Sequence, residues 1–411
     1  MVKHLISSFF TRAIVAGINF AALLFSSHFL GSAVVGQVSL LILNIAIIQT
    51  VNEIYTGSSL AYFIPQSRFK TIYAQGSLFV LSGSAITGLV FLLIRETTLP
   101  DLIHLFLLSV IISLNAFQNM ILLIWEKIST YNLLLLFQPL LLLVTLLVCI
   151  FIFKKRSFDS YLISLYVSFG TFAMISAAFV WKYHRRKTGQ TSPGIYNIIR
   201  NGIQNQLGNL AHTLSNRLNY YILAVPALVG VYASSTSLIE SLWIISAGVS
   251  PLVLTQAANR RNPQQLAIRT LVLARWCFLA ASACVLVIWL LPQSFFIYLL
   301  GKDFTETKTV MLRLSPGVVL VAFSSIISHY FSGQGKQKIL LSANLTGLLF
   351  TLILAWPFIN TWGIYGACYA AALAYAAQAI VLTITFFRDN NLPFRKLLSD
   401  WKGLKFIKDE G

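Results

Sequence analysis

Acidic side chains are scarce in this sequence, and charged residues of either sign are few. There are 12 Asp and Glu against 30 Lys and Arg in 411 residues, so 10% of the chain is charged, whereas about 25% of a soluble domain is. Runs such as 133–153 and 339–358 carry no charge at all. A large soluble helical protein needs a polar outer face on most of its helices. This composition therefore excludes that class and indicates a membrane protein.

Cysteine pairs and the common catalytic motifs are also missing. The cysteines are Cys149, Cys277, Cys284 and Cys368. All four lie within apolar runs without CxxC spacing, which is typical of small buried side chains. Neither HExxH nor GxSxG occurs, and Gly333-Gln-Gly-Lys336 lacks the spacing of a phosphate-binding loop. We therefore expect no enzyme activity, no cofactor and no metal site.

Apolar runs of membrane-crossing length follow one another along nearly the whole chain. A bilayer core of roughly 30 Å needs about 20 apolar residues per helix. Turn and charge signals divide the chain into twelve candidate spans, at 7–29, 37–61, 72–94, 102–124, 131–153, 159–181, 202–224, 230–254, 267–291, 309–332, 338–359 and 362–387. Arg12 and Asn19 interrupt the first run, so we interpret it as a retained helix and not as a signal peptide. The sequence predicts an all-α polytopic membrane protein.

The basic residues orient these spans. With the N-terminus inside, 21 Lys and Arg fall at the inner side and six at the outer side. Because cytoplasmic loops carry the excess of positive charge, both termini are predicted to be cytoplasmic. Lys154-Lys155-Arg156 is the exception, since this topology places it outside. An anionic cytoplasmic leaflet accounts for the net charge of +18, so nucleic acid is not an expected partner.

The most basic internal loop, between Lys182 and Arg200, divides six spans from six. The predicted organisation is an N-terminal six-helix half at 1–184, a basic cytoplasmic linker at 185–200, a C-terminal six-helix half at 201–388 and a basic cytoplasmic tail at 389–411. A weak internal repeat supports the division, because Ala33-Val-Val-Gly36 resembles Ala227-Leu-Val-Gly230. We therefore expect two six-helix bundles around a central cavity, an architecture familiar from transporters.

The segment 202–224 has an amide-rich face inside the apolar chain. At 100° per residue, one side of the helix carries Asn205, Asn209, His212, Asn216 and Asn219. A single asparagine is usually explained by a hydrogen bond to a neighbouring helix. Five polar residues on one face are too many for one neighbour, so we predict that they line a water-filled cavity.

Charged and amide residues on other spans complete the candidate site. A charge at the bilayer centre costs on the order of 2.5 to 3.5 kcal/mol, so such residues usually face a bundle interior or a cavity. Depth along the helices makes Arg12 with Glu53, and Glu240 with Arg275, candidate ion pairs, and leaves Arg217 alone. The predicted substrate-binding residues are Arg12, Asn19, Asn115, Asn119, Asn205, Asn209, His212, Asn216, Arg217, Asn219 and Arg275. The alternative is that the ion pairs only hold helices together.

Three stretches carry a resemblance to a known family. They are Phe29 to Ser39, Val229 to Leu238, and Gly333 to Lys336 followed by Gly363-Ile-Tyr-Gly366. Together they resemble the Wzx-type polysaccharide and O-antigen flippases of the multidrug/oligosaccharidyl-lipid/polysaccharide (MOP) exporter superfamily. The resemblance implies two six-helix bundles forming a V around a central cavity in the bacterial inner membrane. It also implies a substrate, an undecaprenyl-pyrophosphate-linked oligosaccharide that moves from the cytoplasmic to the periplasmic leaflet.

The chemistry of the candidate residues fits that substrate. Arginine can grip phosphate oxygens bidentately, and Asn, Gln and His supply donors and acceptors for sugar hydroxyls. We expect alternating access, with Glu53 and Glu240 as candidate groups for a coupling proton or sodium ion. Besides the lipid bilayer and the substrate, a polysaccharide polymerase or glycosyltransferases are expected partners.

Two rivals from the same superfamily stay open. A multidrug or cation exporter would have a cavity dominated by carboxylates and aromatic rings, whereas the residues here are rich in amides and arginine. A peptidoglycan-precursor flippase would need similar chemistry, and the sequence does not distinguish it. A membrane polymerase or glycosyltransferase would usually need a large outer loop, which this sequence lacks.

Overall fold

The computed structural model describes residues 2–57, 59–94, 99–184, 194–259, 263–393 and 395. Within these ranges every regular element is a helix, which confirms the all-α prediction. The chain divides into two units, Met1–Leu210 and Ala211–Gly411, and the dividing position lies within helix α7 (Ile195–Arg217). The predicted linker is therefore helical from Ile195 onward. Its residues 185–193 and most of the predicted tail lie outside the described ranges.

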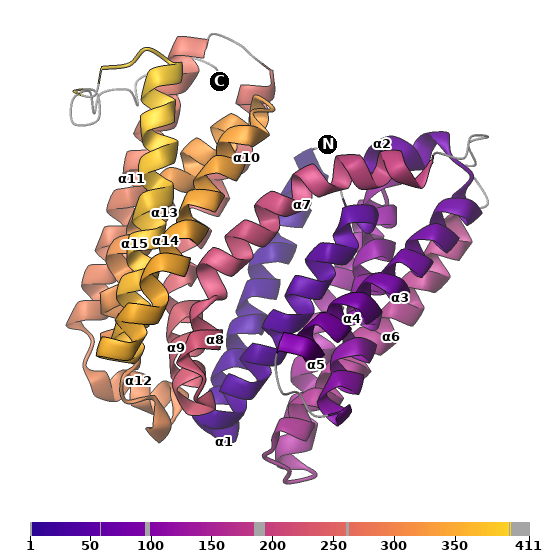
Figure 1. Cartoon of the computed structure of the whole chain (residues 1–411), viewed down its shortest axis with the longest axis horizontal. Helices are drawn as coiled ribbons and strands as arrows, with labels where there is room; N and C mark the ends of the chain where they lie inside the picture. Colours follow the sequence, from indigo (N-terminus) through magenta and orange to yellow (C-terminus); the bar gives the residue numbers. More distant parts are fainter. Residues whose placement is uncertain are drawn as a thin grey trace. The chain divides into compact units, whose positions relative to one another are not determined.

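The first unit is built on a bent helix. Its elements are α1 (Val2–Thr56), α2 (Leu60–Phe63), η1 (Ile64–Gln66), α3 (Phe69–Ile94), α4 (Leu99–Ile124), α5 (Ile128–Phe151), α6 (Phe158–His184) and the beginning of α7. At 1.5 Å per residue, the 55 residues of α1 are about 80 Å long, which is too long for one crossing. The helix bends at Gly31 (φ 80°, ψ 169°), and its second arm returns toward the end where the chain begins (Figure 1). The two arms correspond to the first two predicted spans.

The second unit is organised around helix α13. Its elements after α7 are α8 (Asn219–Leu223), α9 (Pro226–Glu240), η2 (Ser241–Trp243), α10 (Ile244–Ala258), α11 (Pro263–Leu290), α12 (Gln293–Leu300), η3 (Lys302–Phe304), α13 (Thr307–Gly333), α14 (Gln337–Trp362) and α15 (Ile364–Asp389). Of the membrane-crossing stretches, α13 has the largest buried share, 61%. It packs against α9, α10, α11 and α15. The core at one end of this unit includes Phe323, Tyr330 and Phe386.

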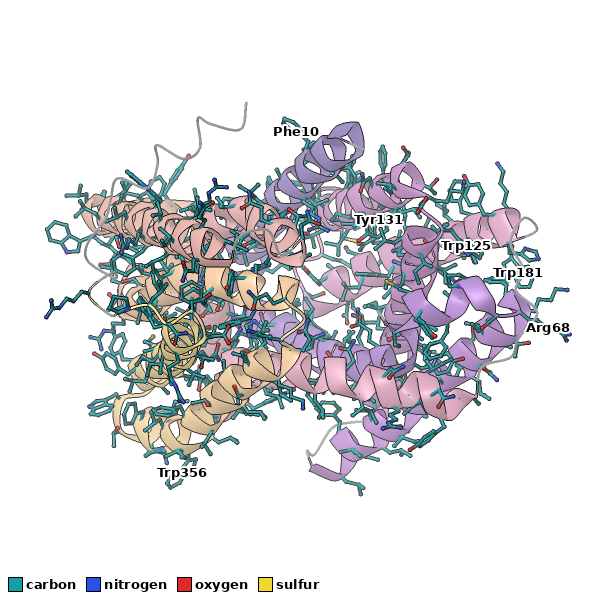
Figure 2. All side chains as sticks on the ribbon, turned by 90° about the horizontal axis from the view of Figure 1, so that it is seen from above. Phe10, Arg68, Trp125, Tyr131, Trp181 and Trp356 are labelled. Carbon is teal, nitrogen blue, oxygen red and sulfur yellow. The ribbon has the colours of Figure 1, made fainter. Side chains whose placement is uncertain are left out.

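Ten helical stretches of the described chain are long and apolar enough to cross a membrane. The bend divides the first of them into two, and α7 with α8 occupies the predicted span at 202–224 but is more polar. Large apolar side chains point outward from these helices. Leu93 is 85% exposed and Trp356 is 65% exposed, and Figure 2 shows Trp356 directed away from the ribbon. The chain is a multi-pass membrane protein whose apolar outer surface suits the lipid core.

One crossing of the second unit is broken in its middle. The stretch Pro226–Ala258 consists of α9 and α10, joined by the single 3-10 turn η2. The turn follows Glu240 directly, and the Trp243 Nε1 at its end donates to the Val318 carbonyl at 3.1 Å. A 3-10 turn inside a helix often marks a functional hinge. The break fixes the position of an acidic side chain in the interior of the unit.

Candidate functional site

Arg217 and Glu240 form the charged centre of the second unit. Arg217 is the last residue of α7, and Glu240 is the last residue of α9. The Arg217 Nη2 lies 2.5 Å from the Glu240 Oε2, and Nη1 donates to Oε1 at 3.2 Å. Both donors of the guanidinium edge therefore bind one carboxylate, which is the geometry of a bidentate pair. The sequence left Arg217 alone, and this prediction is wrong.

Tyr375 of α15 completes the coordination of the carboxylate. Its hydroxyl donates to the Glu240 Oε1 at 2.6 Å. Glu240 is 8% exposed, so its negative charge is stabilised by three donated hydrogen bonds in place of water. The Arg217 side chain is 26% exposed, and its guanidinium carbon lies 5.6 Å from the centre of the Tyr220 ring. One member of the pair is thus buried while the other still reaches the surface of the unit.

A second set of hydrogen bonds holds the end of α7 against α14 and α15. The Gln378 Nε2 donates to the Ser215 Oγ at 2.9 Å, and the Thr351 Oγ1 donates to the Ser215 carbonyl at 3.1 Å. A Cβ at Gly347 would collide with the Gln378 side chain, so the glycine allows the close approach of the two helices. These bonds position the backbone that carries Arg217.

Asn219 lies in a fully buried polar cluster beside the ion pair. Its Nδ2 donates to the Tyr232 hydroxyl at 3.2 Å and to the Ala367 carbonyl at 3.1 Å. Asn219 is 0% exposed, and its Oδ1 has no hydrogen-bond partner among the described residues. Tyr220 contacts the Tyr232 ring edge-on, with the ring centres 5.7 Å apart. Within its unit, Asn219 connects helices and does not face an open surface.

The other residues of the predicted polar face are arranged differently along α7. Asn209 and His212 are exposed, and Asn216 is 6% exposed. The Asn209 Nδ2 donates to the Gln206 Oε1 at 2.9 Å, and the Asn216 Nδ2 lies 3.1 Å from the His212 Nε2. The side chain of Asn205 lies outside the described residues. The face is thus exposed at Asn209 and His212 and turns inward at Asn216.

The predicted residues of the first unit do not form an ion pair. Arg12 and Asn19 are exposed, and Glu53 accepts a hydrogen bond from the Gln49 Nε2 at 2.9 Å. Among the described side chains, the ion pairs are Arg217 with Glu240 and Lys336 with Asp389. The predicted pairing of Arg12 with Glu53 is therefore wrong. Depth along a helix does not determine the direction in which each side chain points.

Asn115 and Asn119 join α4 to α6. The Asn119 Nδ2 donates to the Asn115 Oδ1 at 3.2 Å, and the Ser176 Oγ lies 3.2 Å from the same oxygen. Asn115 is 5% exposed. Asn52 does the same for α1, because its Nδ2 donates to the Ser84 and Ser113 hydroxyls at 2.9 Å each. These amides act inside the first unit as interhelical hydrogen-bonding groups.

Arg275 is buried in α11, at 6% exposure, between the core residues Ala274 and Cys277. The sequence offered it as the partner of Glu240, whose carboxylate is bound by Arg217 and Tyr375. No group of three or more His, Cys, Asp or Glu side chains that could hold a metal ion occurs in the described part of the chain. In the charged centre, the Glu240 carboxylate is engaged by Arg217 and Tyr375, and the partly exposed side chain is that of Arg217.

Sequence reasoning missed three functional candidates. Tyr375 and Gln378 lie in a span that looks almost wholly apolar, and only their contacts single them out. Arg313 is a basic residue inside a span, which was a signal in the sequence. Its guanidinium lies 3.6 Å from the centre of the Tyr365 ring and donates to the Tyr369 hydroxyl at 2.8 Å.

Solved structures with the same arrangement of helices are known. A lipid II flippase MurJ in an inward closed conformation matches with a TM-score of 0.68 and 15% identity, over 100% of this chain and 94% of that one. An inward-facing multidrug resistance MATE transporter of the MOP superfamily matches with a TM-score of 0.69 and 18% identity, over 91% and 94% of the two chains. This chain has the MOP transporter fold.

A third structure with this fold is a MOP superfamily transporter from Pyrococcus furiosus, at a TM-score of 0.65 and 17% identity over 97% of this chain and 96% of that one. The description of that structure gives its binding pocket a reverse polarity and suggests a different function. No protein-family model matches the sequence, and no curated protein matches it. At these identities the likeness concerns the MOP fold alone, so the residues described above must carry any inference about the substrate.

Proposed function

We propose that this protein is a flippase for an undecaprenyl-pyrophosphate-linked oligosaccharide, such as an O-antigen or other surface polysaccharide unit. It would act by alternating access in the bacterial inner membrane, with both termini in the cytoplasm. The proposal rests on the environment and the partial exposure of Arg217. It is a cation in the apolar second unit, held by the buried Glu240, which also accepts from Tyr375, and 26% of the Arg217 side chain is exposed. A preorganised guanidinium that remains reachable is suited to a pyrophosphate.

The exposed polar residues of α7 support a carbohydrate as the second part of the substrate. Asn209 and His212 are exposed on the helix that ends in Arg217. Their amide and imidazole groups supply both donors and acceptors for sugar hydroxyls. In the first unit, Arg12 and Asn19 on α1 are also exposed, and they remain candidates for substrate binding. Arg275 would act from inside α11, as a buried charge that stabilises bound anions.

The same fold serves different substrates, so the rivals are judged by chemistry. The similar structures include a lipid II flippase and multidrug transporters. A multidrug or cation exporter would have a cavity dominated by carboxylates and aromatic rings, whereas the partly exposed charge at the centre of the second unit is the cation of Arg217. A peptidoglycan-precursor flippase is the alternative with similar chemistry, and only a direct comparison of substrates separates it.

Arginine replacement tests the proposed anion site. In proteoliposomes that contain a fluorescent lipid-linked oligosaccharide, Arg217→Gln should lower the initial flipping rate about tenfold or more, because a charged hydrogen-bonding partner of the pyrophosphate is lost. Arg217→Lys should restore part of the rate. Arg388→Gln is the matched control, because Arg388 is exposed at the end of α15. Wild-type rates in both Arg217→Gln and Arg275→Gln would remove arginine from the mechanism.

Coupling to an ion gradient is assigned to the two glutamates. Glu240 shares its carboxylate between Arg217 and Tyr375, so binding of a proton or sodium ion there would release the guanidinium toward the substrate. Transport by wild-type protein should therefore depend on a proton or sodium gradient. The double variant Glu53→Gln, Glu240→Gln should lose that dependence. An unchanged gradient dependence in the double variant would exclude this role.

A further inference from the structure

A separate cavity lies at the end of the second unit where several membrane-crossing helices terminate. It has a volume of about 310 Å³ and is lined by Ala257, Leu266, Tyr330, Gln334, Lys336, Asp389 and Asn390. α10 ends at Ala258, α13 at Gly333 and α15 at Asp389, and α11 begins at Pro263. Because membrane-spanning helices end at the lipid surface, the cavity lies at the level of lipid headgroups.

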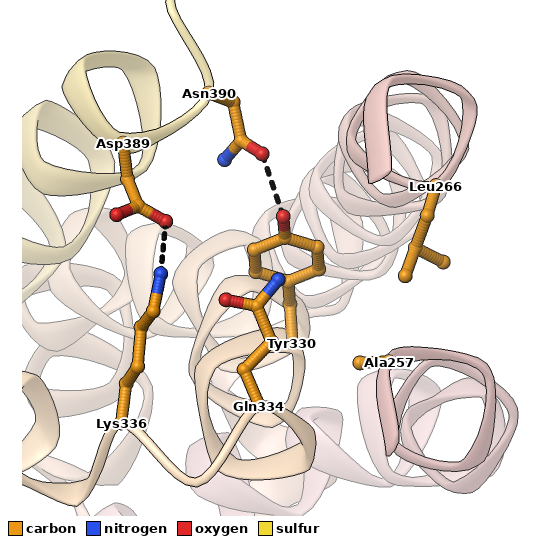
Figure 3. Close-up of a pocket in the computed structure, with 7 residues that line it drawn as sticks. All are labelled: Ala257, Leu266, Tyr330, Gln334, Lys336, Asp389 and Asn390. Carbon is orange, nitrogen blue, oxygen red and sulfur yellow. Dashed lines mark hydrogen bonds and ion pairs between the residues drawn. The ribbon is translucent and has the colours of Figure 1, made fainter. Parts of the chain in front are cut away.

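The cavity has one polar side and one apolar side. Lys336 and Asp389 meet on the polar side, and Tyr330 and Gln334 lie next to them, whereas Ala257 and Leu266 form the opposite wall (Figure 3). The Lys336 and Asp389 side chains are 39% and 31% exposed, so the cavity can be reached from outside. Its volume corresponds to about ten water molecules at ~30 Å³ each, which is ample for a small headgroup.

The hydrogen bonds already present determine which groups remain for a ligand. The Tyr330 hydroxyl donates to the Asn390 Oδ1 at 2.6 Å, and the Asn390 Nδ2 donates to the Phe386 carbonyl at 2.9 Å, so these groups are engaged. The Lys336 Nζ and the Asp389 Oδ2 form an ion pair at 2.5 Å. This pair leaves two N–H groups of the lysine and the second carboxylate oxygen for further partners.

Gln334 supplies an acceptor that lacks a donor. Its Oε1 is buried, and no described residue donates a hydrogen bond to it. A buried acceptor without a partner is unfavourable because it has lost its hydrogen bonds to water, so a ligand with N–H groups would relieve this cost. The cavity thus offers two acceptors, Gln334 and Asp389, beside one cation, Lys336. A zwitterion with a primary ammonium next to a phosphate matches all three.

We infer that this cavity binds a phosphoethanolamine group, as carried by the headgroup of phosphatidylethanolamine. The ammonium donates to the Gln334 Oε1 and the Asp389 carboxylate, and the phosphate lies against the Lys336 Nζ. The apolar wall of Ala257 and Leu266 packs against the part of the lipid where the acyl chains begin. This site is independent of the transported substrate, and it uses none of the residues assigned to transport.

Lipid selectivity of the purified full-length protein tests the inference. Native mass spectrometry in detergent would follow binding of phosphatidylethanolamine, phosphatidylcholine and phosphatidylglycerol with the same acyl chains. Phosphatidylethanolamine should bind about tenfold more tightly than phosphatidylcholine, because a trimethylated ammonium has no N–H to donate to the two acceptors. Equal binding of the two lipids by the wild-type protein would overturn the inference.

Variants locate the selectivity in the cavity. Asp389→Asn and Gln334→Leu should each remove most of the tenfold preference, and Lys336→Gln should weaken binding of all three phospholipids. Lys338→Gln is the matched control, because Lys338 is exposed and does not line the cavity. The unfolding midpoint of each variant without lipid is first compared with that of the wild type. Because two independent variants are tested, the test still holds if one of them misfolds. An undiminished preference in both Asp389→Asn and Gln334→Leu contradicts the assignment.

Competition with soluble phosphoethanolamine identifies the source of the group. If the ligand is a lipid, the soluble compound should displace phosphatidylethanolamine only at much higher concentration, because it lacks the apolar contact with Ala257 and Leu266. Displacement at equal concentration would support the headgroup chemistry and overturn the lipid as its source. Displacement only at a much higher concentration, together with a lost preference in the variants, supports the lipid.

Discussion

Glu240 accepts hydrogen bonds from Arg217 and Tyr375 in the interior of the second unit. Its environment explains why a carboxylate is tolerated in an apolar helix bundle. Loss of one partner of a buried ion pair costs about 3 to 5 kcal/mol when the other charge stays buried, although the partial exposure of Arg217 reduces this figure. The stability of the buried Glu240 carboxylate thus depends on both Arg217 and Tyr375. Each of these partners can be replaced by mutation separately.

Tyr375→Phe tests the smaller of these contributions. The change deletes only the hydroxyl that donates to Glu240 at 2.6 Å, so the free energy of unfolding should fall by about 1.5 kcal/mol. Chemical unfolding in detergent, followed by circular dichroism, measures the difference. Tyr298→Phe is the control, because Tyr298 is 82% exposed and should leave stability unchanged. A loss for Tyr375→Phe no larger than for the control would show that the hydroxyl does not stabilise the carboxylate.

At the scale of whole helices, the bend in α1 has a single cause in the chain. Gly31 has φ 80° and ψ 169°, a backbone conformation that residues with a Cβ avoid. Gly363, between α14 and α15, has φ 57° and ψ −131° and serves the second unit in the same way. Both glycines lie in the stretches that carried the resemblance to a transporter family. The glycines therefore mark corners between successive crossings.

Gly31→Ala should lower the free energy of unfolding by about 1 to 3 kcal/mol, because alanine must adopt a strained conformation at the bend. Gly17→Ala is the matched control on the same helix. A Cβ at Gly17 meets no atom within 4 Å, so that change should be neutral or slightly stabilising. Thermal unfolding of the two variants side by side measures the contrast. Equal midpoints would mean that the bend tolerates a side chain.

The sequence predicted most helices but not most contacts. Apolar runs predicted α3 to α6, α11 and α13 to α15 within a few residues, because membrane crossings demand long apolar helices whatever their neighbours are. They predicted α9 and α10 as one unbroken span and did not predict the short helix α12. The predicted span at 202–224 is occupied by α7 and α8, and amides of this polar segment bind groups such as His212 and the Tyr232 hydroxyl. The partners of Glu240 were missed because Arg217 of α7 and Tyr375 of α15 meet its carboxylate only in the folded unit.

At the scale of the molecule, each unit has its own core and its own polar network. Asn52, Asn115 and Asn119 connect helices of the first unit, and Arg217, Asn219 and Glu240 do so in the second. The polarity of the two networks differs, since the second contains an ion pair and the first consists of amides and hydroxyls. This difference supports the proposal that Arg217 binds the anionic part of the substrate.

The predicted orientation in the membrane follows from the basic loops and can be tested in cells. Variants with a single cysteine in place of Lys154 or Lys338 report the two sides of the membrane, because both lysines are exposed. The four native cysteines are first replaced by alanine. An impermeant maleimide should label Lys154→Cys in spheroplasts and Lys338→Cys only after permeabilisation. The reverse pattern would place the termini outside and would contradict the positive-charge argument.

The most direct test of the proposed function compares substrates in one assay. Purified wild-type protein in proteoliposomes is offered an undecaprenyl-pyrophosphate-linked oligosaccharide, a peptidoglycan precursor and a cationic dye, each with a gradient of protons or sodium. We predict that the initial rate of translocation is about tenfold or more higher for the oligosaccharide lipid than for the other two, and that Arg217→Gln abolishes this difference. Faster movement of the dye, or equal rates for the two lipids, would contradict the account.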